Sequence, residues 1–268
     1  MFAVRRCRRN RSNFRNRMTR LPADFLSAPI AHRGYHDKAD GRVENSLSAF
    51  TAAIDAGYGI ELDLQLSRDS VAMVFHDDQL DRLTEESGRV RDRDAQDLTK
   101  ITLSGGSDHI PTLATVLNHV AGRVPLLIEL KDQHGAMGDT DNALEHATAK
   151  ALKDYEGAVA LMSFNPNMVA NVATLCPDLP RGIVSSAWRK IDGSNVPATT
   201  RARLAGIPDF DRVGASFISH DVTNLDNPRV EELKELGTPI LCWTVRNPEQ
   251  EITARKIADN ITFEEYAA

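Results

Sequence analysis

Two acidic side chains lie two residues apart in an apolar run. Residues 60–66 read Ile-Glu-Leu-Asp-Leu-Gln-Leu, an alternation typical of a β-strand, which places Glu61 and Asp63 on the same face. Two neighbouring carboxylates among Ile and Leu would repel each other and be costly to desolvate unless a cation lay between them. Hard oxygen ligands of this kind suit Mg²⁺, Ca²⁺ or Mn²⁺. The alternative is a strand edge whose acids face solvent.

A second apolar run ends in a carboxylate and an amine. Residues 124–131 read Val-Pro-Leu-Leu-Ile-Glu-Leu-Lys, so Glu129 and Lys131 share one face at the C-terminal end of the expected strand. In parallel barrels and sheets, the C-terminal ends of the strands carry the chemistry. Taken alone, the pair is equally consistent with an exposed Glu–Lys ion pair. Together with Glu61 and Asp63, it predicts a metal site with a phosphate- or substrate-binding cation beside it.

Two histidines stand at the ends of short apolar runs. Residues 29–34 read as a strand that runs into a glycine turn with His32 at its end, and residues 70–77 end in His76 and Asp77. A nearby carboxylate orients a histidine ring and holds its pKa near working pH, as general acid–base catalysis requires. A lone histidine at a strand end is more often structural, but two that flank a candidate metal site favour catalysis. We expect the six others to be structural or on the surface: His36, His109, His119, His134, His146 and His220.

The elements that must hold these residues alternate between strands and helices, which is typical of βαβ units in a parallel sheet. Eight runs read as strands, namely residues 29–33, 60–66, 124–130, 158–164, 181–185, 215–219, 239–245 and 260–263. Helical patterns cover residues 45–56, 112–120, 141–155, 166–175, 228–236 and 248–258, and a short helix with a loop is expected over 187–208. The chain of 268 residues is close to the ~250 that one (β/α)₈ barrel needs. We therefore predict an α/β protein with a single (β/α)₈ TIM barrel.

One apolar run lies outside this count of strands. Residues 68–70 form a turn signal after the second strand, so residues 71–76 are expected to fold back as a hairpin arm. That arm would return His76 to the mouth of the pocket. Residues 78–110 then form a small insertion over the top of the barrel, too short for a separate capping domain.

Basic residues are concentrated at the start of the chain. Residues 1–20 hold eight arginines and no acid, which leaves 24 of the 32 basic residues against 38 acidic ones, a net charge of −14 in the remainder. Such a start resembles a transit peptide or a nucleic-acid-binding arm. We favour translation from Met18, or a disordered arm over residues 1–22 that precedes a barrel over residues 23–268. The acidic body argues against a nucleic-acid partner.

Composition sets further limits on the class of protein. The apolar fraction of 41% is enough for a sizeable core, and Cys7, Cys176 and Cys242 fit neither a disulfide framework nor a zinc spacing. No apolar stretch approaches the roughly 20 residues of a membrane span, and the arginine-rich start lacks the apolar segment of a secretory signal. We expect a cytoplasmic protein without a transmembrane segment that acts on a small molecule, and the oligomeric state stays open.

A series of motifs follows in order from Pro29 to the C-terminus. It comprises His32-Arg33-Gly34, Glu44-Asn45, Ala49-Phe50, Ala52-Ala53-Ile54, Gly57, Glu61-Leu62-Asp63, Asp69, His76-Asp77, Asp81-Arg82, Thr84, Ile110-Pro111-Thr112-Leu113, Ile128-Glu129-Leu130-Lys131, Ser163-Phe164-Asn165 and Cys242-Trp243-Thr244-Val245. Any one of these motifs is weak evidence, but the ordered set is highly specific. It resembles the glycerophosphodiester phosphodiesterase family.

The resemblance implies a metal-dependent phosphodiesterase on a (β/α)₈ barrel that cleaves glycerophosphodiesters to an alcohol and glycerol 3-phosphate. It implies one divalent cation, Mg²⁺ or Ca²⁺ with Mn²⁺ as a further option, held by Glu61, Asp63 and Glu129. It makes His32 and His76 the acid–base pair and leaves open which is the acid. Contacts to phosphate and substrate fall to Arg33, Glu44, Lys131 and Trp243.

The chain departs from the family pattern at three points. Val43 stands where the family usually has proline before the Glu-Asn pair. Residues 259–264 replace a Thr-Asp-Tyr-Pro-like run at the last strand, and the chain ends at Ala268, which leaves no room for a full eighth helix. Barrel closure and the pocket floor near the last strand are therefore the parts that the resemblance predicts least well.

Two rival functions share these motifs. Lysophospholipase D activity, or a lyase that forms a cyclic phosphate, would use the same histidines and cation on the same scaffold. A catalytically silent barrel that acts as a binding protein is a minor alternative, because no ligand residue and neither histidine is missing.

Overall fold

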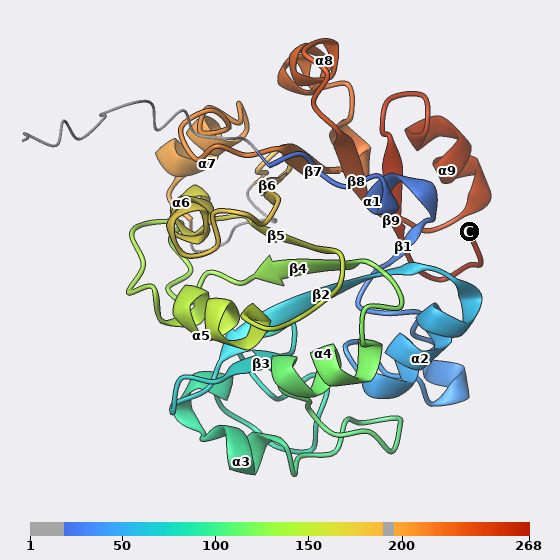
Figure 1. Ribbon diagram of the computed structural model, residues 1–268, viewed down its shortest axis with the longest axis vertical. Coiled ribbons are helices and arrows are strands. Elements are labelled where there is room, and N and C mark those ends of the chain that lie inside the picture. The colour runs from blue at the N-terminus through green and yellow to red at the C-terminus, as the bar shows by residue number, and fades with distance from the viewer. Residues whose placement is uncertain (1–18, 190–195) are drawn as a thin grey trace, which may run out of the picture.

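Eight parallel strands close into a barrel in the computed structural model, which describes residues 19–189 and 196–268 (Figure 1). The chain closes the ring where β1 pairs with both β2 and β9. The predicted (β/α)₈ barrel is thereby confirmed. The barrel strands are β1 (Ile30–Ala31), β2 (Gly59–Leu66), β4 (Leu126–Leu130), β5 (Val159–Ser163), β6 (Arg181–Ser185), β7 (Phe217–Asp221), β8 (Ile240–Val245) and β9 (Asn260–Phe263).

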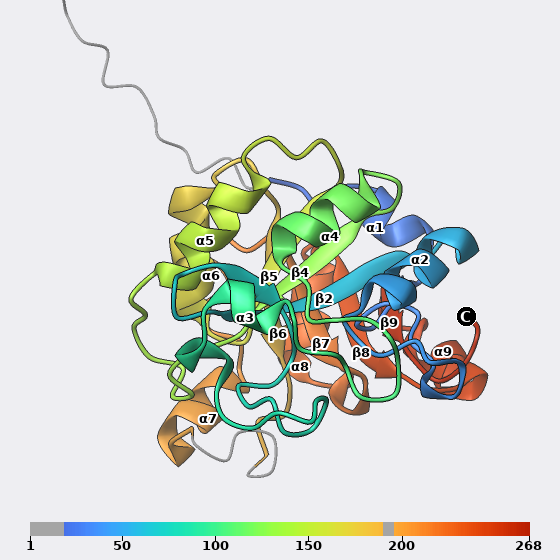
Figure 2. The ribbon, with the colours of Figure 1, turned by 90° about the horizontal axis from the view of Figure 1, so that it is seen from below.

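Helices surround this ring of strands, as Figures 1 and 2 show from two directions. They begin and end at residues whose chemistry favours helix termini: the Ser46 hydroxyl caps α2 by accepting from the Ala49 N–H, and Gly57 ends α2 at a φ of 75°. Residues 264–268, which follow β9, form no helix. The helices are α2 (Leu47–Ala56), α4 (Leu113–Val120), α5 (Ala143–Leu152), α6 (Pro166–Leu175), α7 (Ala198–Leu204), α8 (Pro228–Glu235) and α9 (Pro248–Ala254).

The N-terminal segment covers the end of the barrel at which the strands begin. A short helix, α1 (Asp24–Ser27), places the fully buried Phe25 in the same apolar cluster as Leu21. The Asn260 amide on β9 donates to the Phe25 and Ala28 carbonyls at 2.8 and 2.7 Å. Leu21 lies within the arm expected over residues 1–22, yet it packs as part of the barrel. Residues 1–18 of that expected arm lie outside the described residues.

The segment after β2 forms the expected hairpin and insertion. β3 (Ala72–Val74) pairs antiparallel with β2 after a turn in which Ser70 adopts a φ of 61°. The insertion carries η2 (Val90–Asp92) and α3 (Ala95–Leu98), and Figure 1 shows it as a lobe beside β3. This lobe has an apolar cluster of its own, built from Val43, Met73, Phe75, Leu80, Leu83, Val90, Ala95, Leu98, Ile101, Leu103 and Ile110.

Inward-facing side chains change from apolar to polar along the barrel axis. Leu127, Phe217 and Leu241 fill the lower interior. Gly182 on β6 leaves room for the Phe217 ring, because a Cβ at this position would lie 2.3 Å from that ring. Two residues further along, β4 presents Glu129 to the interior, since inward-facing residues recur with a period of two. The apolar floor thus supports a polar layer at the C-terminal ends of the strands.

Helices of the described residues are all too short or too polar to cross a membrane. This agrees with the absence of a long apolar run in the sequence.

Candidate active site

Three carboxylates from β2 and β4 converge inside the barrel, at the level where β4 ends. The parallel register places Asp63 beside Glu129, and Glu61 precedes Asp63 by one full strand repeat. Each of the three offers a carboxylate oxygen within 4.8 Å of the others. Their side chains are nearly inaccessible to solvent, with relative exposures of 2% for Glu61, 1% for Asp63 and 6% for Glu129. The sequence-predicted ligand set is therefore gathered in one place.

Burial and mutual repulsion shift the pKa values of the carboxylates in this cluster. Burial, together with repulsion from Asp63 and Glu129, raises the pKa of Glu61 well above its ordinary value. Burial acts in the same direction on Asp63, but attraction from Lys131 and other cations outweighs it and holds the pKa of Asp63 below its ordinary range. The cluster therefore needs positive charge to stay ionised.

Two basic side chains supply positive charge at the cluster. The Lys131 ammonium lies 2.8 Å from Asp63 Oδ1 and 2.7 Å from Glu129 Oε1. Burial alone would lower the pKa of Lys131, but the Asp63 and Glu129 carboxylates outweigh it and raise that pKa. Arg33 places its Nε 3.4 Å from Asp63 Oδ2 and donates its backbone N–H to Glu61 Oε2 at 2.9 Å. Two positively charged side chains therefore contact these carboxylate oxygens. A buried set of hard oxygen donors also fits a divalent cation.

His32 lies beside the cluster and is oriented by an acid that directly follows the last strand. Its Nδ1 is 2.5 Å from Glu264 Oε2, and its Nε2 is 4.0 Å from Glu61 Oε2. Burial lowers the pKa of His32, although the hydrogen bond to Glu264 opposes this effect. The carboxylate can only accept when ionised, so Nδ1 carries the proton and Nε2 is free to accept one.

His76 is oriented in the same manner from the hairpin side. Its Nδ1 lies 2.6 Å from Asp77 Oδ1, which leaves its Nε2 for proton exchange. Arg82 of the insertion in turn donates to both Asp77 oxygens, at 2.6 and 3.1 Å. Burial would raise the pKa of Asp77, but the bonds from His76 and Arg82 outweigh it and lower that pKa. Each candidate catalytic histidine therefore has a carboxylate partner of its own.

Glu44 links Arg82 of the insertion to Arg33, the arginine that the resemblance assigns to phosphate binding. It accepts from Arg33 Nη1 at 2.7 Å and from both Nη atoms of Arg82 at 2.8 Å. Burial opposes ionisation, but these two arginines outweigh it and lower the pKa of Glu44 to about 2. Glu44 thus acts on the pocket through Arg33.

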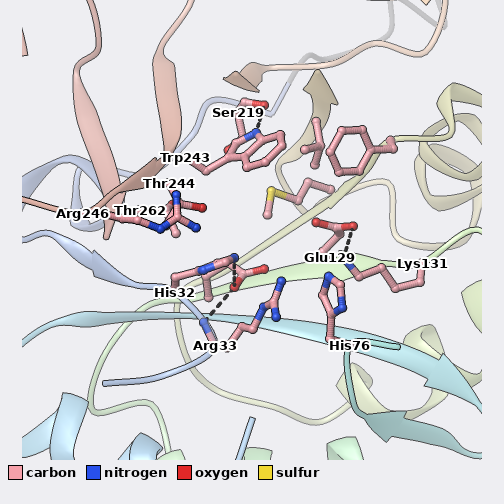
Figure 3. A pocket seen from close by; sticks show the side chains of 14 residues that line it. His32, Arg33, His76, Glu129, Lys131, Ser219, Trp243, Thr244, Arg246 and Thr262 are labelled. Carbon is pink, nitrogen blue, oxygen red and sulfur yellow. Dashed lines mark hydrogen bonds and ion pairs between the residues drawn. The ribbon is translucent and has the colours of Figure 1, made fainter. Parts of the chain in front are cut away.

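A cavity of about 150 Å³ lies over these groups. Figure 3 shows Trp243 across the cavity from His32, Arg33 and His76. The Trp243 indole N–H donates to the Ser219 carbonyl at 3.1 Å. The cavity lining combines charged and apolar residues, namely His32, Arg33, Glu61, His76, Glu129, Lys131, Met162, Phe164, Val184, Ser219, Trp243, Thr244, Arg246 and Thr262.

The sequence did not predict several of these contacts. Glu264 follows β9 directly, so the rule that strand ends carry chemistry could have found it. Arg246 follows β8 in the same way and pairs with Glu264 at 2.6 Å. Arg82 belongs to the Asp81-Arg82 motif, but its contacts were not predicted, because it lies in the insertion, where no strand period applies. Six histidines were expected to be structural or on the surface. Of these, His220 is buried and bonded to Ser185 at 2.7 Å, whereas His36 Nε2 lies 3.7 Å from Glu264, next to the site.

A (β/α)₈ barrel that gathers carboxylates, cations and two histidines at the C-terminal ends of its strands has the architecture of a barrel enzyme. Residues 32–262 match the model of the glycerophosphoryl diester phosphodiesterase family, and the chain belongs to that family. It is accordingly a phosphoric diester hydrolase.

Curated relatives and solved structures agree with this assignment. YhdW of Bacillus subtilis is 29% identical over 229 residues, which are 81% of this chain and 86% of YhdW. A glycerophosphodiester phosphodiesterase of Caldanaerobacter subterraneus is 31% identical over 58% of this chain and 65% of its own length. The structure of an Oleispira antarctica phosphodiesterase in complex with the product sn-glycerol-3-phosphate is 23% identical, with a TM-score of 0.74 over 90% of this chain and 94% of that one. At that identity, the structural match establishes the shared fold.

Proposed function

We propose that this enzyme hydrolyses glycerophosphodiesters to an alcohol and glycerol 3-phosphate, with one divalent cation held by Glu61, Asp63 and Glu129. The observation that carries the proposal is the convergence of three buried carboxylates within 4.8 Å beside two histidines that each have a carboxylate partner. Mg²⁺, Ca²⁺ and Mn²⁺ all suit such oxygen donors. When bound, the cation offsets phosphate charge and polarises a phosphoryl oxygen.

The chain's own residues perform the proton transfers. One histidine accepts a proton at Nε2 from the attacking water, and the other donates a proton from Nε2 to the oxygen of the departing alcohol. Water adds to phosphorus as the ester P–O bond breaks, so the products are an alcohol and a phosphomonoester. Glu264 and Asp77 hold the two rings in orientation and stabilise the protonated imidazole that forms.

Arg33 and Lys131 stabilise the phosphate as its negative charge shifts in the transition state. Both side chains line the cavity, and both are already held at the carboxylate cluster. Fixed positive groups in a water-poor site stabilise developing charge without having to reorganise. Trp243 supplies an apolar wall on the other side of the cavity.

The Oleispira antarctica structure was solved with sn-glycerol-3-phosphate as its product, which supports a small-molecule diester as the substrate here. A cytoplasmic location without a nucleic-acid partner belongs to the same proposal. The net charge of −14 after residue 20 is the argument against a nucleic-acid partner.

The test is a substrate screen with product analysis. Glycerophosphocholine, glycerophosphoethanolamine, glycerophosphoglycerol and lysophospholipids would each be incubated with Mg²⁺, Ca²⁺ and Mn²⁺ in turn. Free glycerol 3-phosphate from the first three supports the proposal. A cyclic phosphate would identify a lyase, turnover confined to lysophospholipids would identify a lysophospholipase D, and binding without turnover would identify a silent barrel.

A further inference from the structure

Arg82 of the insertion binds two carboxylates at once, beside the active site. Its Nε and Nη2 donate to Asp77 Oδ2 and Oδ1 at 2.6 and 3.1 Å. Its Nη1 and Nη2 donate to Glu44 Oε2 and Oε1, both at 2.8 Å. All three guanidinium nitrogens therefore take part in directed bonds. The planar fork of arginine suits such paired contacts, which a single ammonium group cannot reproduce.

Each of these carboxylates also bonds a residue of the cavity. Asp77 Oδ1 lies 2.6 Å from His76 Nδ1, and Glu44 Oε1 accepts from Arg33 Nη1 at 2.7 Å. Both His76 and Arg33 line the cavity (Figure 3). Arg82 is not one of the lining residues in the described ranges of the chain. It therefore reaches the proton-transfer group and the phosphate-binding group through Asp77 and Glu44.

The apolar cluster of the insertion holds the backbone at both ends of these contacts. The Thr84 hydroxyl donates to the Leu80 carbonyl at 2.9 Å, which fixes the turn that carries Arg82. The cluster includes buried residues directly next to Glu44 and His76 and on both sides of Arg82, namely Val43, Phe75, Leu80 and Leu83. The segments that carry the three polar contacts thus share one core.

Other arginine–carboxylate pairs of the same region end at the surface. Arg68 donates to both oxygens of Asp94 at 2.9 and 2.7 Å, and Arg93 pairs with Glu86 at 3.0 Å. As far as the structure describes the chain, neither Asp94 nor Glu86 bonds a residue that lines the cavity. Exposed ion pairs of this kind contribute little to stability. The contacts of Arg82 differ because they lead into the active site.

We propose that Arg82 is a positioning residue that fixes His76 and Arg33 relative to each other. The inference rests on the proposed function, in which His76 exchanges a proton and Arg33 stabilises the phosphate. Groups that act together on one transition state must be held in a fixed geometry, and small displacements slow catalysis strongly. Without Arg82, Asp77 and Glu44 would each lose a partner and could turn independently. The insertion thus takes part in catalysis through a residue outside the cavity.

The first test measures kcat on glycerophosphocholine with Mg²⁺, Ca²⁺ or Mn²⁺. Arg82→Ala should lower kcat by about 10- to 100-fold, as expected when a residue that orients an active-site group is lost. The matched control is Arg68→Ala, which removes another paired arginine–carboxylate contact. This control should keep kcat within about twofold of the wild type. Circular dichroism checks that both variants fold.

Chemical rescue separates positioning from a general effect on stability. The Arg82 side chain is 46% exposed, so a small cation can enter the space that Arg82→Ala leaves. Guanidinium chloride, well below denaturing concentrations, should restore part of the lost rate because its planar fork bonds carboxylates as arginine does. Methylammonium chloride at the same concentration lacks this geometry and should restore less. Neither salt should raise the rate of Arg68→Ala.

A cycle of variants tests the route through the two carboxylates. If Arg82 acts only through Asp77 and Glu44, its removal should add little once both are neutralised. In Asp77→Asn/Glu44→Gln, the further change Arg82→Ala should therefore alter kcat by less than about threefold. An additional loss of about 10-fold or more would overturn the proposal, because Arg82 would then act by another route.

The outcomes distinguish this inference from the function on which it rests. A wild type that releases no glycerol 3-phosphate from any glycerophosphodiester with any of the three cations would overturn the proposed function. A wild-type kcat for folded Arg82→Ala, an equal loss for Arg68→Ala, or no preference for guanidinium over methylammonium would overturn the positioning role alone. If Arg82→Ala does not fold, Arg82→Lys replaces it. Its kcat should fall by about fivefold or more, the worth of one lost hydrogen bond, and a wild-type kcat would overturn the proposal.

Discussion

His32 Nδ1 lies 2.5 Å from Glu264 Oε2, although the two residues are 232 positions apart in the chain. Closure of the barrel brings them together, because β9 pairs in parallel with β1 and places Phe263 beside Ala31. Burial would raise the pKa of Glu264, but its bond from His32 outweighs this effect and holds that pKa below the ordinary range. The residue directly after the last strand therefore orients a catalytic candidate directly after the first strand.

Replacing Glu264 by glutamine should slow turnover by about 10- to 1,000-fold, because a neutral amide stabilises the protonated His32 ring less well. The measurement is kcat on glycerophosphocholine, with circular dichroism to confirm the fold. Glu265→Gln is the matched control, since this neighbour is 63% exposed and pairs with Arg246 at 3.7 Å. Equal rates for the two variants would show that Glu264 does not contribute to catalysis.

His32→Ala and His76→Ala should each lower kcat by about 10² to 10⁴ while the fold is retained, as expected for the loss of a positioned proton donor or acceptor. A diester with a p-nitrophenol leaving group needs no proton on departure. It should therefore rescue the variant that lacks the general acid and leave the other impaired. Near-native turnover of a natural diester by either variant would make that histidine structural.

The Glu44 carboxylate should make stability depend on pH in the acid range. Its pKa is lowered from 4.5 to about 2 in the folded protein, so its contribution is present above about pH 4.5 and is lost as pH falls toward 2. A shift of this size corresponds to roughly 3 kcal/mol at neutral pH. Urea unfolding should show that the Glu44→Gln variant has a lower free energy of unfolding than the wild type at pH 7. This difference should shrink toward pH 3.

The control for this experiment carries no titratable group. Thr148→Val alters a fully buried hydroxyl on α5, so its stability gap from the wild type should not change with pH. A Glu44→Gln gap that is equally independent of pH would contradict the assignment of Glu44 as a carboxylate held ionised by two arginines.

A chain that begins at Met18 should fold and turn over small diesters like the full chain, because residues 19–28 retain the apolar cover of the barrel. A chain that begins at Pro29 should melt at a lower temperature, since it loses the buried Leu21 and Phe25. Thermal unfolding of the two truncations checks this. Insolubility or inactivity of the Met18 chain would show that residues 1–17 are structural.

The arginine-rich start should matter for anionic membranes. Each arginine near such a surface contributes about 1 kcal/mol of attraction, and salt weakens it. Co-sedimentation with anionic vesicles should therefore separate the full chain from the Met18 chain at low salt. Equal binding of the two chains would exclude this role.

Much of the fold and part of the site follow from local rules. The period of two in residues 60–66 puts Glu61 and Asp63 on one face whatever the tertiary structure, and the parallel barrel then brings Glu129 beside them. The hairpin after β2 follows from its turn residues, so the position of His76 could be predicted as well.

The remaining contacts depend on closure and on irregular backbone. Glu264 reaches His32 only through the β1–β9 register, and the sequence there departs from the family pattern. Arg82 reaches Glu44 and Asp77 from a loop whose path has no sequence period. The strand predicted over residues 215–219 begins two residues later, at residue 217, because its start depends on how the preceding loop enters the sheet.

The release of glycerol 3-phosphate from glycerophosphocholine, measured before and after chelation, tests the central claim most directly. Removal of divalent cations with EDTA should abolish release, and added Mg²⁺, Ca²⁺ or Mn²⁺ should restore it, because Glu61, Asp63 and Glu129 offer hard oxygen ligands. Asp63→Asn, which removes charge with little change in shape, should need more cation and turn over more slowly at saturation. Full turnover by the chelated, metal-free protein would contradict the account.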